Sequence, residues 1–196
     1  MRTRPAVCWS GSVAGPTLAE LEAGFAHVSA ESARHEDQRL GIIACREALE
    51  AARAGNYGVG AVLVDPEGRI VARGRNSVFF PRFRSDLHAE MVVMNAFETR
   101  YPRSKHMRGY TLVCSLEPCP MCLARLLVAG VQTVKFLARD DLAGMVGHRG
   151  KFPAAWRRLW RRQEFVRADV SGGLRRFALD VFLLNLEACR RRLLSR

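Results

Sequence analysis

The 196-residue sequence lacks long hydrophobic runs, internal repeats and low-complexity tracts, and only three of its 31 basic residues are lysine. No uninterrupted apolar stretch approaches the roughly 18 residues of a membrane-spanning helix, so we expect neither a membrane span nor a membrane partner. Serine and glycine interrupt residues 6–15, which argues against a secretory signal. A chain of this length without repeats is expected to fold as one globular domain.

Cysteine is also sparse. Four of the six cysteines are scattered along the chain, three of them within apolar segments: Cys8, Cys45, Cys114 and Cys189. This usage is typical of reduced thiols and predicts a cytoplasmic protein. The remaining two, Cys119 and Cys122, stand three positions apart and belong to a different pattern.

Two short motifs about thirty residues apart are the main chemical signal: His88-Ala89-Glu90 and Pro118-Cys119-Pro120-Met121-Cys122. One imidazole and two thiolates offer three protein ligands to Zn²⁺, which leaves its fourth tetrahedral position open for a water, as in catalytic zinc sites. Bound zinc lowers the pKa of that water to roughly 7. The Glu90 carboxylate, two residues from His88, is placed for general acid–base work. The pattern H-x-E…P-C-x-x-C is typical of zinc nucleobase deaminases.

Two simpler interpretations of these residues exist. The thiols could be core residues beside a surface histidine, or they could belong to a structural zinc site, which needs a fourth protein ligand that is not evident. The order and spacing of the motifs, and the proline directly before Cys119, favour a catalytic zinc instead. We therefore expect zinc ligands His88, Cys119 and Cys122, with Glu90 as the catalytic residue.

Both motifs are expected at the starts of helices. Apolar residues from Met91 to Phe97 predict a helix over 88–99, with Asp86 as its N-cap. Pro118 is expected in the first turn of the second helix, where its missing N–H costs little. Two positive helix N-termini would then converge on the metal and favour thiolate ligands.

Strands and helices alternate around the motifs. The β-branched runs 61–65 and 70–74 flank Asp65-Pro66-Glu67-Gly68, a strong turn signal, and predict a hairpin. Apolar patterning predicts further strands and helices, the strands at 111–115, 133–137 and 165–170 and the helices at 37–54 and 174–194. This alternation predicts an α/β sandwich with one mixed sheet.

With these motifs the sequence resembles the cytidine/deoxycytidylate deaminase superfamily, and within it the branch of tRNA adenosine deaminases and guanine deaminases. The resemblance covers residues 38–145 and rests on five segments: 58–65, 74–76, 88–90, 115–122 and 138–140. It implies a three-layer α/β/α cytidine deaminase-like fold with one mixed five-stranded sheet. It also implies a deaminase domain over 36–196 and a homodimer.

The resemblance assigns roles to single residues as well. It implies the same zinc ligands, with Glu90 as the proton shuttle. Asn76, at the end of the second strand, would hydrogen-bond the substrate; the alternative is an ordinary turn residue that closes the strand. Backbone groups near Ala61, Ala89 and Ser115 would hold the base.

The implied reaction is hydrolytic deamination, in which oxygen replaces an exocyclic amine and ammonia is released. We expect a free nucleobase, a nucleoside or a related amino-heterocycle as substrate, because the chain departs from tRNA adenosine deaminases at two places. Those enzymes typically have Asp-Pro-Thr-Ala before His-Ala-Glu, where this chain has 84–87, and the resemblance fades beyond Asp141. Asp141 itself could read the amino edge of a purine or serve as a turn residue.

Two alternatives remain. The first is a tRNA-specific adenosine deaminase that converts adenosine to inosine at the wobble position. The second is a binding protein that keeps the zinc fold without turnover, which the presence of Glu90 disfavours.

The excess of positive over negative charge lies entirely in the second half of the chain. Residues 1–99 carry 11 basic and 12 acidic side chains, a net charge of −1, whereas residues 100–196 carry 20 and 7, a net charge of +13. The charge is densest at Trp156–Arg162 and Arg190–Arg192. The segment Trp156–Arg162 could contact RNA phosphates, pack its tryptophans inward as an amphipathic helix, or bind an anionic membrane surface.

Residues 1–35 are expected to form an N-terminal extension. Proline, glycine and serine punctuate the first sixteen residues and predict a mobile start. Residues 17–30 could form an amphipathic helix capped by Thr17, which packs on the core, pairs two subunits or has no function. The aromatic residues Phe79, Phe80 and Phe83 could stack on a base, cover the pocket, anchor a loop or contact a second subunit.

Overall fold

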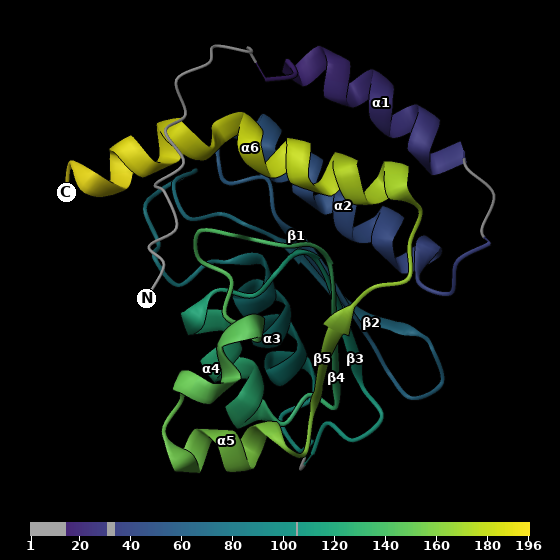
Figure 1. The fold of residues 1–196 in the computed structure, drawn as a ribbon, viewed down its shortest axis with the longest axis vertical. Coiled ribbons are helices and arrows are strands. Elements are labelled where there is room, and N and C mark those ends of the chain that lie inside the picture. The colour runs from purple at the N-terminus through teal and green to yellow at the C-terminus, as the bar shows by residue number, and fades with distance from the viewer. Residues whose placement is uncertain (1–14, 31–33, 105) are drawn as a thin grey trace, which may run out of the picture.

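The computed structural model describes residues 15–30, 34–104 and 106–196. Helices and strands alternate along most of this part of the chain (Figure 1). In chain order they are α1 (Leu18–Ala30), α2 (Gln38–Arg53), β1 (Gly60–Val64), β2 (Ile70–Arg75), α3 (Ala89–Arg100), β3 (Thr111–Leu116), α4 (Pro120–Ala129), β4 (Thr133–Ala138), the 3-10 helix η1 (Val146–Lys151), α5 (Ala154–Trp160), β5 (Glu164–Arg167) and α6 (Gly172–Leu194).

The strands form one mixed five-stranded sheet in the order β2-β1-β3-β4-β5. β1 pairs antiparallel with both β2 and β3, whereas β3, β4 and β5 run parallel. The predicted hairpin and the predicted mixed sheet are therefore confirmed. β1 is buried along its whole length, which explains why it reads as an unbroken apolar run without alternation.

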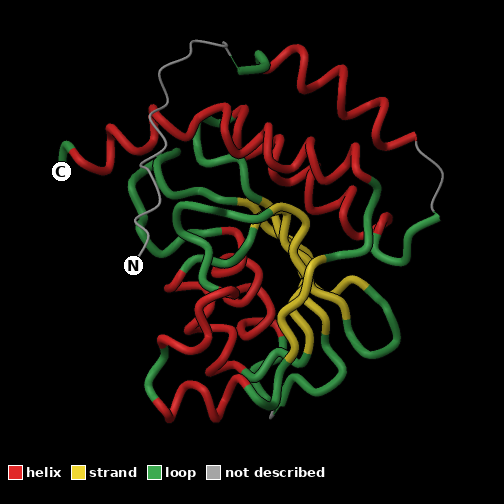
Figure 2. Tube along the Cα trace, in the orientation of Figure 1, coloured by secondary structure: helices red, strands yellow, loops and turns green. Residues whose placement is uncertain are grey.

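Helices cover both faces of the sheet (Figures 1 and 2). α2 and α6 pack on one face, while α3 and α4 lie on the other, with α5 outside α4. This arrangement confirms the three-layer α/β/α fold. The parallel strands β3 and β4 end beside the starts of α3 and α4, so side chains from both helices can meet at one edge of the sheet.

α1 adds an outer layer over α2 and α6. Leu21 and Val28 are buried there, and the ring centroids of Phe25 and Phe177 lie 5.3 Å apart. The helix 17–30 therefore packs on the core, one of the roles that the sequence left open. Thr17 caps it as expected, because its hydroxyl accepts the Glu20 N–H at 3.3 Å. The mobile start expected for residues 1–16 concerns mainly residues 1–14, which lie outside the described residues.

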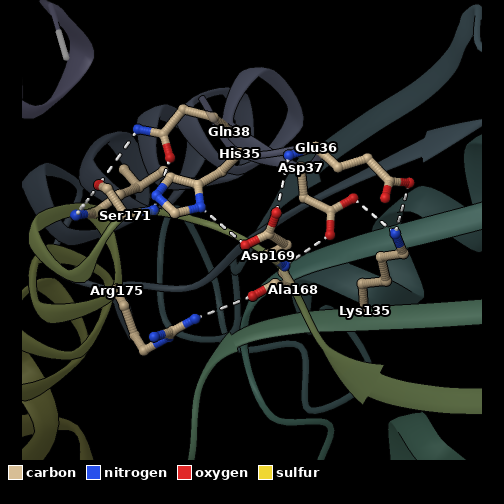
Figure 3. A network of polar contacts seen from close by, with 10 residues as sticks. His35, Glu36, Asp37, Gln38, Lys135, Ala168, Asp169, Ser171 and Arg175 are labelled. Atoms are coloured by element: carbon tan, nitrogen blue, oxygen red, sulfur yellow. Dashed lines mark hydrogen bonds and ion pairs between the residues drawn. The ribbon is translucent and has the colours of Figure 1, made fainter. Parts of the chain in front are cut away.

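A buried polar network ties the start of α2 to the segment between β5 and α6 (Figure 3). Lys135 donates to Asp37 Oδ1 at 2.8 Å, and Asp37 Oδ2 accepts the Asp169 N–H at 2.8 Å. Gln38 Oε1 accepts the Ser171 N–H at 2.9 Å. We call these five residues the α2 clasp. Because Asp37 and Gln38 are buried and hydrogen-bonded, the clasp fixes one docking position of α2 against α6.

The segment Trp156–Arg162 comprises most of α5 and the turn that follows it. Trp160 is buried against Leu123 and Leu127 of α4, while the four arginines at 157, 158, 161 and 162 are exposed. The structure thus shows an amphipathic helix that packs a tryptophan inward. No described helix is long and apolar enough to cross a membrane.

Candidate active site

The three expected zinc ligands lie at the N-termini of two helices. His88 is the N-cap residue of α3, Cys119 is the N-cap residue of α4, and Cys122 follows in the first turn of α4. Two details differ from the sequence expectation. Asp86 does not cap α3 and instead pairs with Arg84 at 2.7 Å. The proline at the start of α4 is not the one expected, because the helix begins at Pro120. The convergence of two helix N-termini is as predicted.

The geometry of the three ligands fits zinc. One donor atom from each residue lies within 4.8 Å of the other two, and Cys119 Sγ is 3.5 Å from His88 Nδ1. Tetrahedral zinc with ordinary Zn–S and Zn–N bonds places these two atoms about 3.5 Å apart. Hydrogen bonding from Cys122, together with His88, lowers the pKa of the Cys119 thiol to about 4. A thiolate is the form that binds metal.

Glu90 lies beside this ligand set, in the first turn of α3. Its side chain is buried, yet it lines the same cleft as His88 and Cys119. Burial, reinforced by the neighbouring Cys119 thiolate, raises the pKa of Glu90 to about 7. A carboxyl group with such a pKa can take up and release a proton near neutral pH, as general acid–base catalysis requires.

The cleft above these residues has a volume of about 330 Å³. Tyr57, Val59 and Asn76 line it from the segments that flank β1 and β2. The loop after β4 contributes residues 140, 142 and 143. The C-terminal half of α6 supplies Phe182, Leu186, Arg190 and Leu193. The cleft thus has an apolar wall, a cation on α6 and carboxylates close to the metal ligands.

Asn76 directly follows β2 and is almost fully buried at the cleft. Its Oδ1 accepts the Val78 N–H at 3.2 Å, as in an ordinary turn. With the oxygen engaged, the amide NH₂ is the group that can donate to a substrate. The two roles considered for Asn76 are therefore compatible, and substrate binding stays a prediction.

The other residues predicted to contact the substrate do not line the cleft. Ala61, Ala89 and Ser115 are buried and do not belong to the cleft lining, and the Ser115 hydroxyl accepts the Gly60 N–H at 3.0 Å. Asp141 is exposed and lies outside the lining, whereas the adjacent Asp140 is part of it. The carboxylate that the structure offers to a substrate is thus one residue earlier than expected.

Sequence reasoning missed the contribution of α6 and of Glu117. Glu117 directly precedes the second zinc motif, within the resembling segment 115–122, so its position was a usable signal. Nothing in the local pattern of α6 indicates which of its residues face the cleft. The loop that contains Phe79, Phe80 and Phe83 is anchored: Asn56 Oδ1 accepts the N–H groups of Phe79 and Phe80 at 2.7 and 3.0 Å, and none of the three rings lines the cleft.

Residues 34–138 match the family model for the cytidine and deoxycytidylate deaminase zinc-binding region. A tRNA-specific adenosine deaminase of Bacillus subtilis is 38% identical over 104 residues, which are 53% of this chain. The chain spans 63% of that relative, less than two thirds of its length.

Two solved structures share the fold. One is from a study of A-to-I editing by tRNA:A34 deaminases, with a TM-score of 0.59, 25% identity, and coverage of 68% of this chain and 99% of that one. The other is a guanine deaminase from Nitrosomonas europaea, with a TM-score of 0.55, 23% identity, and coverage of 83% and 92%. The second likeness concerns the fold alone.

Proposed function

Because the chain belongs to the cytidine and deoxycytidylate deaminase family, we propose that it is a zinc-dependent hydrolytic deaminase that converts adenosine to inosine in tRNA, at the wobble position. The sequence alone favoured a small substrate, and the similarity to tRNA-specific adenosine deaminases supports the alternative instead. The structural observation that carries the proposal is the run of arginines near the C-terminal end of α6. Arg190 lines the cleft, and the exposed Arg191 and Arg192 follow it in the chain, outside the cleft lining.

The residues around the metal ligands divide the work of the reaction. His88, Cys119 and Cys122 would hold the zinc ion, which when bound would lower the pKa of the attacking water. Glu90 accepts a proton from the attacking water and passes it to the ring nitrogen next to the reacting carbon. It then takes the second proton from the newly added hydroxyl group and gives it to the departing amine. Water and the amino-heterocycle thus give a carbonyl and ammonia. The Asn76 amide NH₂ holds the base in place during these proton transfers.

The arginines at the end of α6 suit a phosphodiester chain that leads away from the cleft. The guanidinium groups of Arg192 and Arg196 lie over the rings of Phe80 and Phe83, at 4.8 and 3.5 Å from the ring centroids. These contacts place positive charge beside the segment that leads into α3. Clustered arginines neutralise phosphates and give salt-dependent affinity for RNA. The exposed arginines of α5 are not part of the cleft lining.

A free purine base such as guanine is the second candidate substrate, favoured by Asp140. Asp140 lines the cleft, and a carboxylate accepts hydrogen bonds from the ring N–H groups of free guanine. The adenine of an adenosine has no ring N–H for such a contact. Asp140 is therefore the residue whose role differs most between the two candidates.

Ammonia release by the zinc-loaded protein tests the proposal, with unmodified tRNA offered in parallel with guanine, adenine, cytosine and their nucleosides. We expect inosine in tRNA, and a rate that falls steeply as salt rises from 50 to 200 mM, a range over which phosphate contacts weaken strongly. Turnover of free guanine without turnover of tRNA would reject the tRNA proposal in favour of the second candidate. The homodimer stays a prediction, which sedimentation equilibrium checks.

A further inference from the structure

We propose that Glu117 is a positioning residue whose buried carboxylate, together with Gly144, holds the 139–146 loop in place as a wall of the substrate cleft. The proposal rests on the proposed deaminase function, since the wall is that of the same site. The mechanism above leaves Glu117 without a role, although this carboxylate lines the cleft and is only 5% exposed.

Glu117 joins the loop before α4 to the loop after β4. Its N–H donates to the Ala138 carbonyl at 2.9 Å, and its Oε1 accepts the Val146 N–H at 2.9 Å. Arg139 Nε lies 3.9 Å from Oε2 and partly balances the charge. A buried carboxylate is stable only with such partners. The carboxylate of Glu117 is thus used to hold backbone, at a place where the backbone carries cleft residues.

Gly144 gives independent evidence for the same contact. A Cβ built at Gly144 would lie 2.5 Å from the Glu117 carboxyl carbon, 2.7 Å from Oε2 and 2.5 Å from the Asp140 carbonyl oxygen. Any side chain there would push the loop away from Glu117. Glycine is needed for close approach of two segments, a familiar use of this residue.

The 139–146 loop has an internal turn and separate attachments. Asp140 Oδ1 accepts the N–H groups of Leu142 and Ala143 at 3.0 Å each, which stiffens the turn but does not attach it to the rest of the protein. The attachments are the Glu117–Val146 bond and a Met145 N–H to Pro118 carbonyl bond of 3.2 Å. Asp140, Leu142 and Ala143 all line the cleft, so the position of the wall depends on these attachments.

The loop also lies wholly outside the part of the chain that matches the family model, which ends at residue 138. Glu117 lies inside that part. A residue inside the matched region therefore sets the position of a wall that lies outside that region. Such an arrangement allows the wall to differ between substrates while its attachment stays the same.

The test compares Glu117→Ala, Glu117→Gln and Gly144→Ala with the wild-type protein. Glutamine keeps the Oε1 acceptor for the Val146 N–H, whereas alanine removes it. We expect Glu117→Ala and Gly144→Ala each to raise KM about tenfold or more with a smaller fall in kcat, because misplaced binding groups weaken positioning of the substrate. The KM and kcat of Glu117→Gln should each stay within about threefold of the wild-type values. Zinc content should remain stoichiometric in all three.

Gly150→Ala is the matched control for Gly144→Ala. A Cβ at Gly150 would meet no described heavy atom within 4 Å, so this variant should behave as wild type. A catalytic role for Glu117 would make Glu117→Gln as inactive as Glu117→Ala, and would overturn the proposal. A purely structural role would lower Tm without changing KM, which would overturn it as well.

Amide hydrogen exchange of residues 142–147 gives a readout that does not depend on turnover. Exchange there should be faster in Glu117→Ala and Gly144→Ala than in wild type and Glu117→Gln. Unchanged exchange in Glu117→Ala would reject the attachment itself. Failure of the proposed function is seen separately, as absence of tRNA turnover by the wild-type protein. The kinetic comparison then uses whichever substrate the wild type converts.

Discussion

Single residues at the candidate active site differ in how they divide structural and chemical tasks. His88 and Cys119, two of the three residues positioned to bind a metal, stand at the N-cap positions of α3 and α4, but neither side chain makes a capping hydrogen bond, so both remain available to a metal. Asn76 holds a turn with its oxygen and presents its NH₂ to the cleft. Substitutions that keep one task and remove the other can therefore separate structure from catalysis.

Glu90→Gln should abolish deamination while zinc binding persists. Glutamine has nearly the same shape but cannot carry the proton, and loss of a general acid–base group costs about 10²–10⁴-fold in rate. Metal analysis and ammonia release measure the two properties. Glu98→Gln, on the exposed side of the same helix, is the control and should remain active. Equal activity of the Glu90 variant and wild type would show that another group moves the proton.

Asn76→Asp should reduce kcat/KM by about tenfold to a hundredfold, because it loses one buried hydrogen bond to the substrate. The aspartate keeps an oxygen for the Val78 N–H, so thermal unfolding should change little. Asn76→Ala loses both groups and serves as the comparison. If only Asn76→Ala is impaired, Asn76 is a turn residue and its substrate role is wrong.

Elements with strong local signals were predictable from the sequence. The β1–β2 hairpin follows from a clear turn sequence, and α3 and α4 follow from apolar runs that begin at the two motifs. The α2 clasp was not predictable, because Asp37, Lys135 and Asp169 come from distant segments and look like ordinary surface charges. Tertiary contacts alone show that Asp37 is buried.

Lys135→Met should lower the free energy of unfolding by about 2–3 kcal/mol, because it leaves the buried Asp37 carboxylate without its cation. Urea denaturation measures the loss. Adding Asp37→Asn to this variant should recover part of it, since the amide carries no charge. A full, additive loss in the double variant would show that the two side chains do not act as a pair.

The α2 clasp also predicts how the stability of the protein depends on pH. Burial lowers the pKa of Lys135, but hydrogen bonding and charge from Asp37 and Glu36 outweigh it, so the pKa is raised in the folded protein. The contribution of Lys135 to the free energy of unfolding is then complete below the ordinary lysine pKa. It is lost as the pH rises through the higher pKa that Lys135 has in the folded protein. The stability difference between wild type and Lys135→Met should therefore shrink only at strongly alkaline pH.

At the scale of the whole molecule, the zinc-motif core of the site was predictable and its substrate wall was not. Three ligands and a carboxylate could be found because they are close in sequence and limited by metal chemistry. The preference for a small substrate was based on the segments that flank the motifs. That preference did not take account of Arg190 as a cleft residue, because no sequence pattern shows that α6 reaches the cleft.

Metal removal should destabilise the entire molecule. A ligand that binds only the folded state stabilises it by about 4 kcal/mol at a thousandfold excess over Kd, which is about 10 °C in Tm for a chain of this size. Calorimetry before and after chelation measures the shift. Zn²⁺ should restore Tm, whereas Mg²⁺ should not, because magnesium does not favour thiolate ligands. An unchanged Tm would mean that the ligand set binds no metal in the folded protein.

α6 follows every other described element in the chain, yet its C-terminal half walls the cleft. During translation the zinc motifs and all five strands therefore leave the ribosome before the helix that completes the substrate wall. A chain that stops before α6 would therefore carry the expected zinc ligands but would lack the wall formed by Leu186, Arg190 and Leu193. We expect such a chain to bind zinc without holding a base.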